Sequence, residues 1–440
     1  FQTIAGITYR NDQGELQINE DGAPANMDEL PFVYDHLEDF SHKIIYYESS
    51  RGCPFRCAYC LSSLEKKLRF RSLDLVKKEL GFFLQAKVPQ VKFLDRTFNC
   101  NPRRTVDLWQ WILDHDNGIT NFHFEIAADL ITEEELAIME QMRPGLIQLE
   151  IGVQSTNTDT IREIRRTMRL EEVREHVARI KEKGNIHQHL DLIAGLPYED
   201  IKSFRKSFDD VYSMRPDQLQ LGFLKVLKGS YMQEMQQEYE LRYKEEPPYE
   251  VLSTKWLPYS DVIELKGIEE MVEIYYNSGQ FTHVVEALVE NYASAYQMYQ
   301  DLWQYYEEHD YMGIQHRRSA RYEIVLDFVK EKYPEQADVM RELLTYDYYL
   351  RENAKSRPEF AGEDATDKRF VRAFYEEEEK ERKHLPGYEQ FDRNQMRKMT
   401  HLEYFPHMGK MLLFDYKFRN PLNQEARTCM IKKDSLERRG

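Results

Sequence analysis

The chain of 440 residues has only five cysteines and no apolar run long enough to cross a bilayer. So few cysteines exclude a disulfide framework, which uses an even number of them in a short secreted chain. A charged fraction of 31%, a mean hydropathy of −0.71 and no visible signal peptide are typical of a cytoplasmic protein. The net charge of −17 argues against a nucleic-acid groove, which needs clustered Lys and Arg. We therefore expect neither a membrane nor a nucleic acid as partner.

Three of the cysteines, Cys53, Cys57 and Cys60, form a Cys-x3-Cys-x2-Cys loop directly after an apolar run. Three thiolates on one short loop can hold three irons of a cubane cluster and leave the fourth iron open to a substrate. Zinc is the alternative, but zinc needs a fourth ligand, and no Cys or His lies between Cys60 and Cys100. Cys100 and Cys429 suit small buried apolar positions. The loop therefore predicts an iron-sulfur cluster.

This cysteine loop resembles that of the radical S-adenosylmethionine (SAM) superfamily. The resemblance implies a [4Fe-4S] cluster whose open iron chelates SAM. It also implies that one electron splits SAM to a 5'-deoxyadenosyl radical, which abstracts hydrogen from an unactivated position under anaerobic conditions. A reductase such as flavodoxin or ferredoxin would supply the electron. The substrate, a small molecule or a peptide, is not identified by the sequence.

Short apolar runs alternate with amphipathic stretches from residue 43 to about residue 226, a pattern typical of βα units around a parallel sheet. We expect strands at 43–49, 91–97, 122–127, 146–153, 186–193 and 219–226. Helices are expected between them, for example at 72–86, 132–141 and 203–212, and Thr132 and Glu135 have the spacing of a capping box. The family resemblance implies that the six units form an α/β fold, a partial (β/α)6 TIM-like barrel.

Several of these strands carry polar residues at every second position, which places those residues on one face. A barrel interior built for stability alone would be mostly Val, Ile and Leu. Because helices should cover the outer face, we expect a polar cavity inside, with a solvent-facing edge as the alternative. The face comprises His123, Glu125, Gln148, Glu150, Gly152, Gln154, His187, His189, Asp191, Gln218 and Gln220.

Four residues of this face are candidate substrate contacts, namely His187, His189, Glu150 and Gln148. The alternative is a mononuclear iron site built from His187, His189 and a carboxylate.

The resemblance covers about residues 41–230 and implies SAM contacts position by position. Tyr59 corresponds to the aromatic residue that packs on the adenine. Asp95 lies where the family commonly has a Gly-Gly-Glu turn that receives the SAM amino group, but the glycines are absent here. Taken alone, Asp95 could instead cap the following helix, and Arg166 could lie on a solvated helix face. The positions that hold the ribose, amino and carboxylate groups correspond to Glu125, Gln154, Arg166 and Asp191.

The first forty residues resemble the linker between a cobalamin-binding domain and the barrel in the cobalamin-dependent branch of the superfamily. The resemblance rests on residues 4–10, a turn at 11–14 and the Leu30-Pro31 stretch. We expect that any cobalamin is bound by a domain upstream of Phe1, because the chain begins without Met and shows no cobalamin ligand motif. A plain β-hairpin and linker packed under the barrel is the alternative.

Beyond residue 230 the pattern changes to long helices rich in tyrosine, for example at 269–276, 292–308 and 322–333. Residues 411–418 and 426–432 predict a terminal β-hairpin. This region resembles the uncharacterised C-terminal domain of some cobalamin-type radical SAM proteins, and we expect it to close the barrel mouth as a lid. The expected parts are a linker and hairpin at 1–40, the barrel at 41–230 and a mostly helical domain at 231–440.

The sequence thus predicts a radical SAM enzyme. Its reaction on the substrate would be a cobalamin-dependent methyl transfer or rearrangement, or a hydrogen abstraction without cobalamin. A non-catalytic carrier of an iron-sulfur cluster or haem is the third hypothesis.

Overall fold

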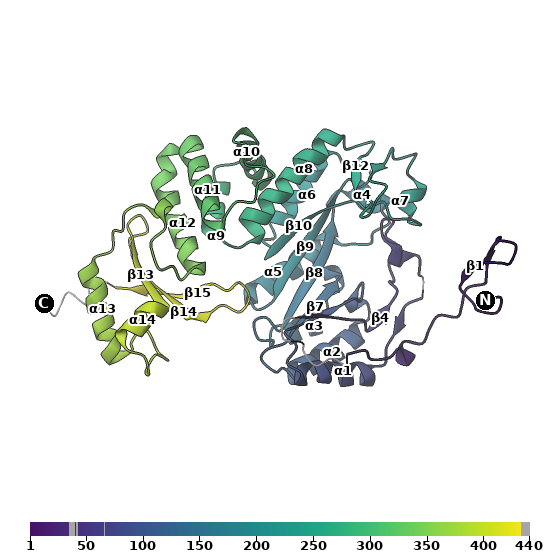
Figure 1. Cartoon of the computed structure of the whole chain (residues 1–440), viewed down its shortest axis with the longest axis horizontal. Helices are drawn as coiled ribbons and strands as arrows, with labels where there is room; N and C mark the ends of the chain where they lie inside the picture. The colour runs from purple at the N-terminus through teal and green to yellow at the C-terminus, as the bar shows by residue number, and fades with distance from the viewer. Residues whose placement is uncertain (35–39, 41–42, 66, 433–440) are drawn as a thin grey trace.

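The computed structural model describes residues 1–34, 40, 43–65 and 67–432. Small pieces of all three expected parts, residues 35–39, 41–42, 66 and 433–440, therefore lie outside the described residues. At the centre is a six-stranded parallel sheet in the order β3-β6-β7-β8-β9-β10 (Figure 1). Its strands are β3 Ile44–Tyr47, β6 Gln90–Phe93, β7 Asn121–Ile126, β8 Ile147–Gln154, β9 His187–Ala194 and β10 Gln218–Phe223. They coincide with the six expected strands, and the partial-barrel fold is confirmed.

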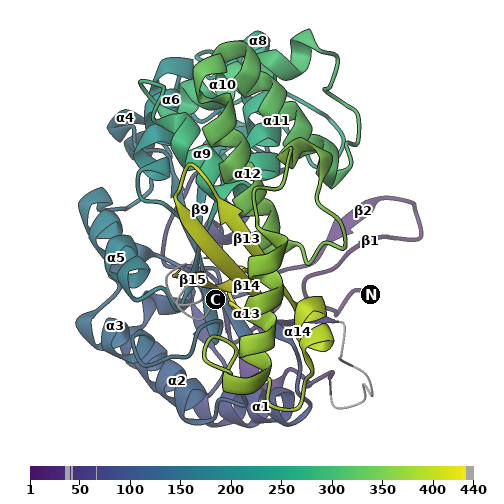
Figure 2. The ribbon, with the colours of Figure 1, turned by 90° about the vertical axis from the view of Figure 1, so that its left-hand side faces the viewer.

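The connecting helices lie around the outside of this sheet (Figure 2). They are α1 Leu73–Gln85, α2 Pro102–Asp114, α3 Glu133–Met139, α4 Thr158–Glu163, α5 Leu170–Lys183 and α6 Ile201–Tyr212. Their ends follow local rules. Thr132 and Glu135 form the expected capping box of α3, Asn101 caps α2 ahead of Pro102, and Gly184 ends α5 in the left-handed conformation.

The two faces of the sheet differ as the alternation of residues predicts. On β8, Ile147, Leu149 and Ile151 are buried toward the helices, whereas Gln148 and Glu150 lie on the opposite face. The parallel register aligns these polar residues in rows across the sheet. One row contains Lys92, His123, Gln148 and His187, and the next contains Glu125, Glu150, His189 and Gln218. The interior of the barrel is therefore polar, as expected.

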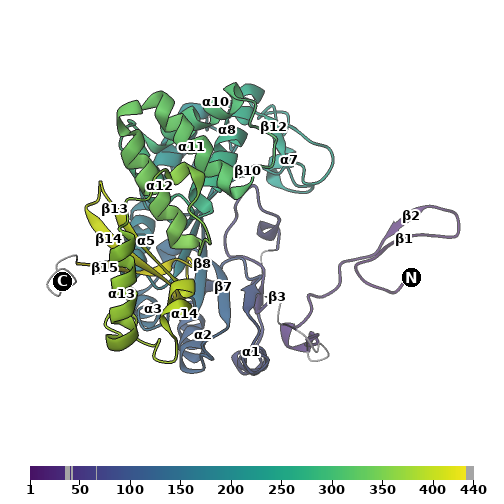
Figure 3. The ribbon, with the colours of Figure 1, turned by 60° about the vertical axis from the view of Figure 1, so that its left-hand side comes forward.

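Short elements surround the barrel. The expected N-terminal hairpin, β1 Thr8–Arg10 with β2 Leu16–Ile18, extends away from the rest of the chain (Figure 3) and does not pack under the barrel. Two further pairs are β4 Ser50–Arg51 with β5 Arg69–Phe70, and β11 Arg242–Tyr243 with β12 Val251–Ser253. The 3-10 turns are η1 Met27–Glu29, η2 Leu61–Ser63, η3 Phe98–Cys100, η4 Ala128–Leu130, η6 Pro334–Gln336 and η7 Glu359–Ala361.

The C-terminal part begins with helices and ends in a small sheet. The helices are α7 Tyr231–Glu234, α8 Tyr259–Val272, which a π-helical turn extends over Glu273–Asn277 (η5), α9 Thr282–Val289, α10 Ala295–Glu308, α11 Arg318–Lys332 and α12 Ala337–Arg351. Tyrosines fill much of their core, and the hydroxyls of Tyr275 and Tyr306 pair at 2.6 Å. After α13 Lys368–Glu381 and α14 Arg393–Met399, the expected hairpin is a three-stranded antiparallel sheet of β13 Thr400–Phe405, β14 Lys410–Arg419 and β15 Ala426–Ile431.

The described residues of the C-terminal part contact the barrel at both ends of its strands, and the lid stays a prediction. At the carboxyl ends, Met232 donates its N–H to Ala58 O at 3.3 Å and Val251 donates to Leu224 O at 2.9 Å.

One hydrophobic core continues from the barrel into α8–α12, and Leu219 at the start of β10 donates its N–H to Asn277 at 2.9 Å. The turn between β14 and β15 places Leu422 beside Gly145, just before β8 begins. The contacts of Leu219 and Leu422 lie at the N-terminal ends of the strands, opposite the carboxyl ends where barrel sites are built.

None of the helices among the described residues has the length and apolar character needed to span a membrane.

Candidate functional site

The two ends of the cysteine loop lie close together, and backbone hydrogen bonds hold its middle in place. Pairing of β4 with β5 brings its ends together, and Gly52, at φ +95°, lies so close to Lys67 that a Cβ would be 2.9 Å from the Lys67 carbonyl oxygen. At the back of the loop, Ala58 donates its N–H to Ile164 O at 2.8 Å and accepts one from Met232 at 3.3 Å. The loop is thereby fixed above the carboxyl ends of the strands.

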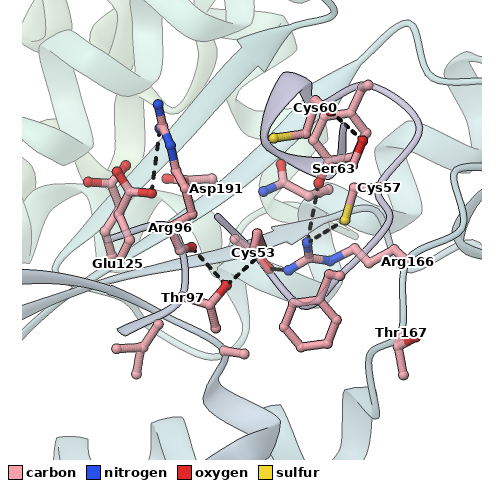
Figure 4. A pocket seen from close by; sticks show the side chains of 17 residues that line it. Cys53, Cys57, Cys60, Ser63, Arg96, Thr97, Glu125, Arg166, Thr167 and Asp191 are labelled. Atoms are coloured by element: carbon pink, nitrogen blue, oxygen red, sulfur yellow. Dashed lines mark hydrogen bonds and ion pairs between the residues drawn. The ribbon is translucent and has the colours of Figure 1, made fainter. Parts of the chain in front are cut away.

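The three cysteines face a cavity of about 180 Å³ at this end of the barrel (Figure 4). All three are free thiols, and Cys57 is buried. Every residue that lines the cavity lies between positions 53 and 191. Nine of the thirteen residues singled out in the sequence meet here, namely Cys53, Cys57, Cys60, Tyr59, Glu125, Glu150, Gln154, Arg166 and Asp191.

Arg166 and Gln154 form one wall of the cavity. The Arg166 guanidinium donates through Nη1 to Tyr59 Oη at 3.2 Å and to Cys57 Sγ at 3.8 Å, and through Nη2 to the Gly152 carbonyl. Gln154 ends β8 in the left-handed conformation, at φ +73°. Two polar atoms of this wall, Gln154 Oε1 and Arg166 Nε, are buried and have no hydrogen-bond partner in the described part of the chain. Buried polar atoms normally have partners, so this wall has the character of a ligand site.

Three carboxyl groups line the opposite side of the cavity. Glu150 accepts from Lys92 Nζ at 3.0 Å and lies 2.9 Å from His123 Nε2, and these two partners lower its pKa to about 2. Burial and the negative charge of Glu150 raise the pKa of Glu125 to about 7 and that of Asp191 to about 8. Glu125 therefore titrates near neutral pH and Asp191 is mostly protonated there, so both carboxyl groups can donate hydrogen bonds to hydroxyls as well as accept them.

The other candidate substrate contacts lie outside the cavity lining, on the same inner face. Gln148 contacts His123 through Nε2 at 2.8 Å, and His189 Nε2 lies 3.0 Å from Asp191 Oδ1. Burial lowers the pKa of His189 to about 4 and lowers that of His187 as well. Both imidazoles are therefore neutral at pH 7. His189 lies in the same row as Glu125 and Glu150, which line the cavity, and His187 lies one row below.

The mononuclear iron site considered as an alternative, with His187, His189 and a carboxylate, differs from the group of possible metal ligands in the structure. Ligand atoms of Glu150, His189 and Asp191 lie within 4.8 Å of one another, but His187 is not among them. A cation at this position would compete with Lys92, which donates to Glu150 at 3.0 Å, and with His123, whose Nε2 lies 2.9 Å from the same carboxylate.

Two family profiles match this chain. The radical SAM superfamily profile matches residues 47–211, and a protein family of unknown function, DUF4080, matches residues 237–420. Residues 47–211 belong to the radical SAM superfamily. The family expected from the cysteine loop is confirmed.

Two curated relatives match about a quarter of this chain. An uncharacterised methyltransferase of Pyrococcus horikoshii is 34% identical over 116 residues, 24% of this chain and 25% of that protein. An oxygen-independent coproporphyrinogen-III oxidase-like protein of Bacillus subtilis is 30% identical over 118 residues, 27% of this chain and 23% of that protein. The chain thus spans about a quarter of each. A radical SAM methyltransferase of Kitasatospora setae, solved with cobalamin and a [4Fe-4S] cluster, has a TM-score of 0.41 and 14% identity over 47% of this chain and 43% of its own.

The groups that the radical SAM superfamily implies fit the residues present. Three free cysteines on a fixed loop suit a [4Fe-4S] cluster with one open iron. The unpartnered pair in the adjacent wall, an acceptor on Gln154 and a donor on Arg166, suits a ligand with both an ammonium and a carboxylate. SAM carries both groups on its methionine half.

Asp95 differs from the other expected SAM contacts, because it is not among the residues that line the cavity. The expected contact between this strand end and the SAM amino group stays a prediction. The Asp95 carboxylate is 1% exposed. It accepts from Ser49 N and Ser49 Oγ, both at 2.7 Å, and from Ser50 Oγ at 2.6 Å. Asp95 therefore anchors the chain where it enters the cysteine loop.

Several residues in or beside the cavity were not predicted from the sequence. Lys92 shares the inner face of β6 and could have been found from the alternation that begins at buried Val91. Arg96, Thr97 and Ser63 also line the cavity. Thr97 Oγ1 is 3.5 Å from Cys53 Sγ, a contact between chain segments that no local pattern indicates.

Proposed function

We propose that this protein is a radical SAM enzyme that binds a [4Fe-4S] cluster on Cys53, Cys57 and Cys60 and cleaves SAM reductively. The cluster, when bound, would supply the single electron that splits SAM into methionine and a 5'-deoxyadenosyl radical. The observation that carries the proposal is the cavity in which three free thiols lie beside the unpartnered Gln154 and Arg166 atoms. A one-electron donor of the flavodoxin or ferredoxin class would reduce the cluster.

Each cavity residue has a role that its chemistry suits. Arg166 would hold the SAM carboxylate and Gln154 would accept from the ammonium group. Tyr59 would pack on the adenine. In their protonated forms, the carboxyl groups of Glu125 and Asp191 would bond the ribose hydroxyls without the cost of a buried charge.

The substrate would enter the polar interior next to SAM. Glu150 reaches the cavity, His189 lies in the same row of the inner face, and Gln148 and His187 lie one row below. Neutral histidines and amides offer donors and acceptors without net charge. These four residues stay candidate substrate contacts.

A cobalamin-dependent methyl transfer is the second candidate for the reaction on the substrate. It is favoured by the methyltransferase of Pyrococcus horikoshii among the relatives, and the extended N-terminal hairpin suits a linker to a cobalamin-binding domain. Anaerobic turnover with added methylcobalamin would test it. Release of S-adenosylhomocysteine beside 5'-deoxyadenosine is expected for methyl transfer, and 5'-deoxyadenosine alone is expected for hydrogen abstraction without cobalamin.

The proposed function is tested with anaerobically reconstituted protein, dithionite and SAM. We expect 5'-deoxyadenosine and a [4Fe-4S]+ electron paramagnetic resonance (EPR) signal that changes when SAM is added. Cys57→Ala should abolish SAM cleavage, whereas the matched Cys429→Ala, in the remote C-terminal sheet, should retain it. Cleavage by the Cys57 variant would reject the assignment. A cluster that ignores SAM would favour the carrier hypothesis, and bound zinc without a cluster would reject both.

A further inference from the structure

Arg166 contacts the cysteine loop and, with Gln154, also forms the wall of the cavity that would hold SAM. Its Nη1 is shared between Cys57 Sγ at 3.8 Å and Tyr59 Oη at 3.2 Å, and Figure 4 shows the guanidinium pointing at the Cys57 sulfur. Its Nη2 is bound to the carbonyl of Gly152 on β8. One side chain therefore joins a cluster cysteine, the adenine-side tyrosine and the central strand.

The backbone around Arg166 keeps this contact in place. Ile164, two residues earlier, is fully buried and accepts the N–H of Ala58, next to Cys57. The guanidinium lies directly beside Gly152, where a Cβ would be 3.5 Å from Arg166 Nη2, an ordinary van der Waals distance. The neighbouring Arg165 points elsewhere, with its guanidinium 3.7 Å from the centre of the Tyr231 ring. The contact with the sulfur belongs to Arg166 alone of these two arginines.

A donor and a positive charge at a ligand sulfur favour the reduced state of a cluster, because reduction adds negative charge to the iron-sulfur unit. Hydrogen bonds to the sulfurs and nearby charge are among the factors that set the reduction potentials of such clusters. Arg166 supplies both at Cys57, in a partly buried position where water screens the charge weakly.

We propose that Arg166 is a positioning residue that raises the reduction potential of the cluster and couples it to SAM binding. This inference rests on the proposed function. The same guanidinium would meet the SAM carboxylate through its free Nε edge, so SAM binding would change the charge that Cys57 experiences. Because such coupling is reciprocal, SAM would bind the oxidised and reduced cluster with different affinities, and part of that difference would depend on Arg166.

The test is a potentiometric titration of the reconstituted cluster, followed by EPR, with and without SAM. Arg166→Gln removes the charge and the guanidinium fork, and we expect a more negative potential and a smaller shift on SAM addition than in the wild type. Arg166→Lys keeps a charge without the fork, so an intermediate potential is expected. Arg165→Gln is the matched control and should titrate like the wild type.

Several outcomes separate this inference from the proposed function. If Arg166→Gln titrates at the wild-type potential without SAM, Arg166 acts only on SAM and the inference is overturned. If Arg165→Gln shifts the potential equally, the effect is general surface charge and the inference also fails. If the wild-type cluster does not respond to SAM, the proposed function itself fails. If Arg166→Gln takes up no iron, the potential of Arg166→Lys is compared with that of the wild type instead, and an unchanged potential overturns the inference.

Discussion

Replacement of Asp95 distinguishes a scaffold role from the SAM-binding role expected from the family pattern. The carboxylate is buried and accepts from the Ser49 N–H and from the hydroxyls of Ser49 and Ser50. In Asp95→Ala these donors lose their acceptor at the entry to the cysteine loop. We therefore expect loss of stability and of iron uptake together.

The magnitude follows from the donors involved. A buried donor that is left without an acceptor costs about 1–3 kcal/mol. The two hydroxyls can rotate to new partners, but the backbone N–H of Ser49 cannot, so we expect Asp95→Ala to lower the free energy of unfolding by about 1–3 kcal/mol. Asp95→Asn keeps an acceptor for that N–H, and its cost should be about 1 kcal/mol.

The assay is urea unfolding of the reduced, metal-free protein, combined with iron content after reconstitution. Asp107→Ala serves as control, because Asp107 is a partly exposed carboxylate on α2 that pairs with Lys77, and such pairs contribute up to about 1 kcal/mol. The scaffold argument is refuted if Asp95→Ala unfolds like the wild type and takes up full iron while its affinity for SAM falls.

Two further predictions concern the end of β8. Burial raises the pKa of Glu199, which accepts from Ser155 and Ser207, from its ordinary 4.5 to about 7. Protonated Glu199 therefore contributes stability that is fully present below pH 4.5, and about 3 kcal/mol of the free energy of unfolding is lost as the pH rises to 7. Glu199→Gln should remove this loss when the free energy of unfolding is measured at pH 5 and pH 8. The same decrease between these two pH values in the wild type and the variant would contradict the prediction. Gly152→Ala places a Cβ 2.2 Å from Gln154 Nε2, so the Gln154 side chain must move. We expect the variant to fold normally but to bind SAM about tenfold more weakly, as measured by calorimetry. An unchanged affinity for SAM would show that Gln154 is not a ligand.

Much of the barrel could be predicted because its signals are local. Alternation along β8 and β9 identified both the strands and the polar inner face, and the Thr132 capping box marked the start of α3. The family pattern predicted Arg166 as a SAM contact, but not its contact with Cys57. The roles of the cavity residues stay predictions.

Other features depend on tertiary contacts that no periodicity encodes. The direction of the Asp95 side chain depends on Ser49, which lies 46 residues earlier. Strand β13 was missed because it follows α14 without a turn, Met399 being the last helical residue and Thr400 the first of the strand. The position of the C-terminal part depends on contacts such as Leu422 with Gly145, which only the folded chain brings together.

The continuous core between the barrel and α8–α12 has a consequence for how the chain can be divided. Asp209 of α6 receives the N–H of Tyr296 in the first turn of α10 at 2.9 Å, and Asn277 binds the backbone of Leu219 on β10 through both its amide atoms. A fragment that ended at residue 230 would expose the apolar side of β10 and α6 to water. We expect the segments matched by the two family profiles to unfold in a single cooperative transition, and neither to be stable as an isolated fragment.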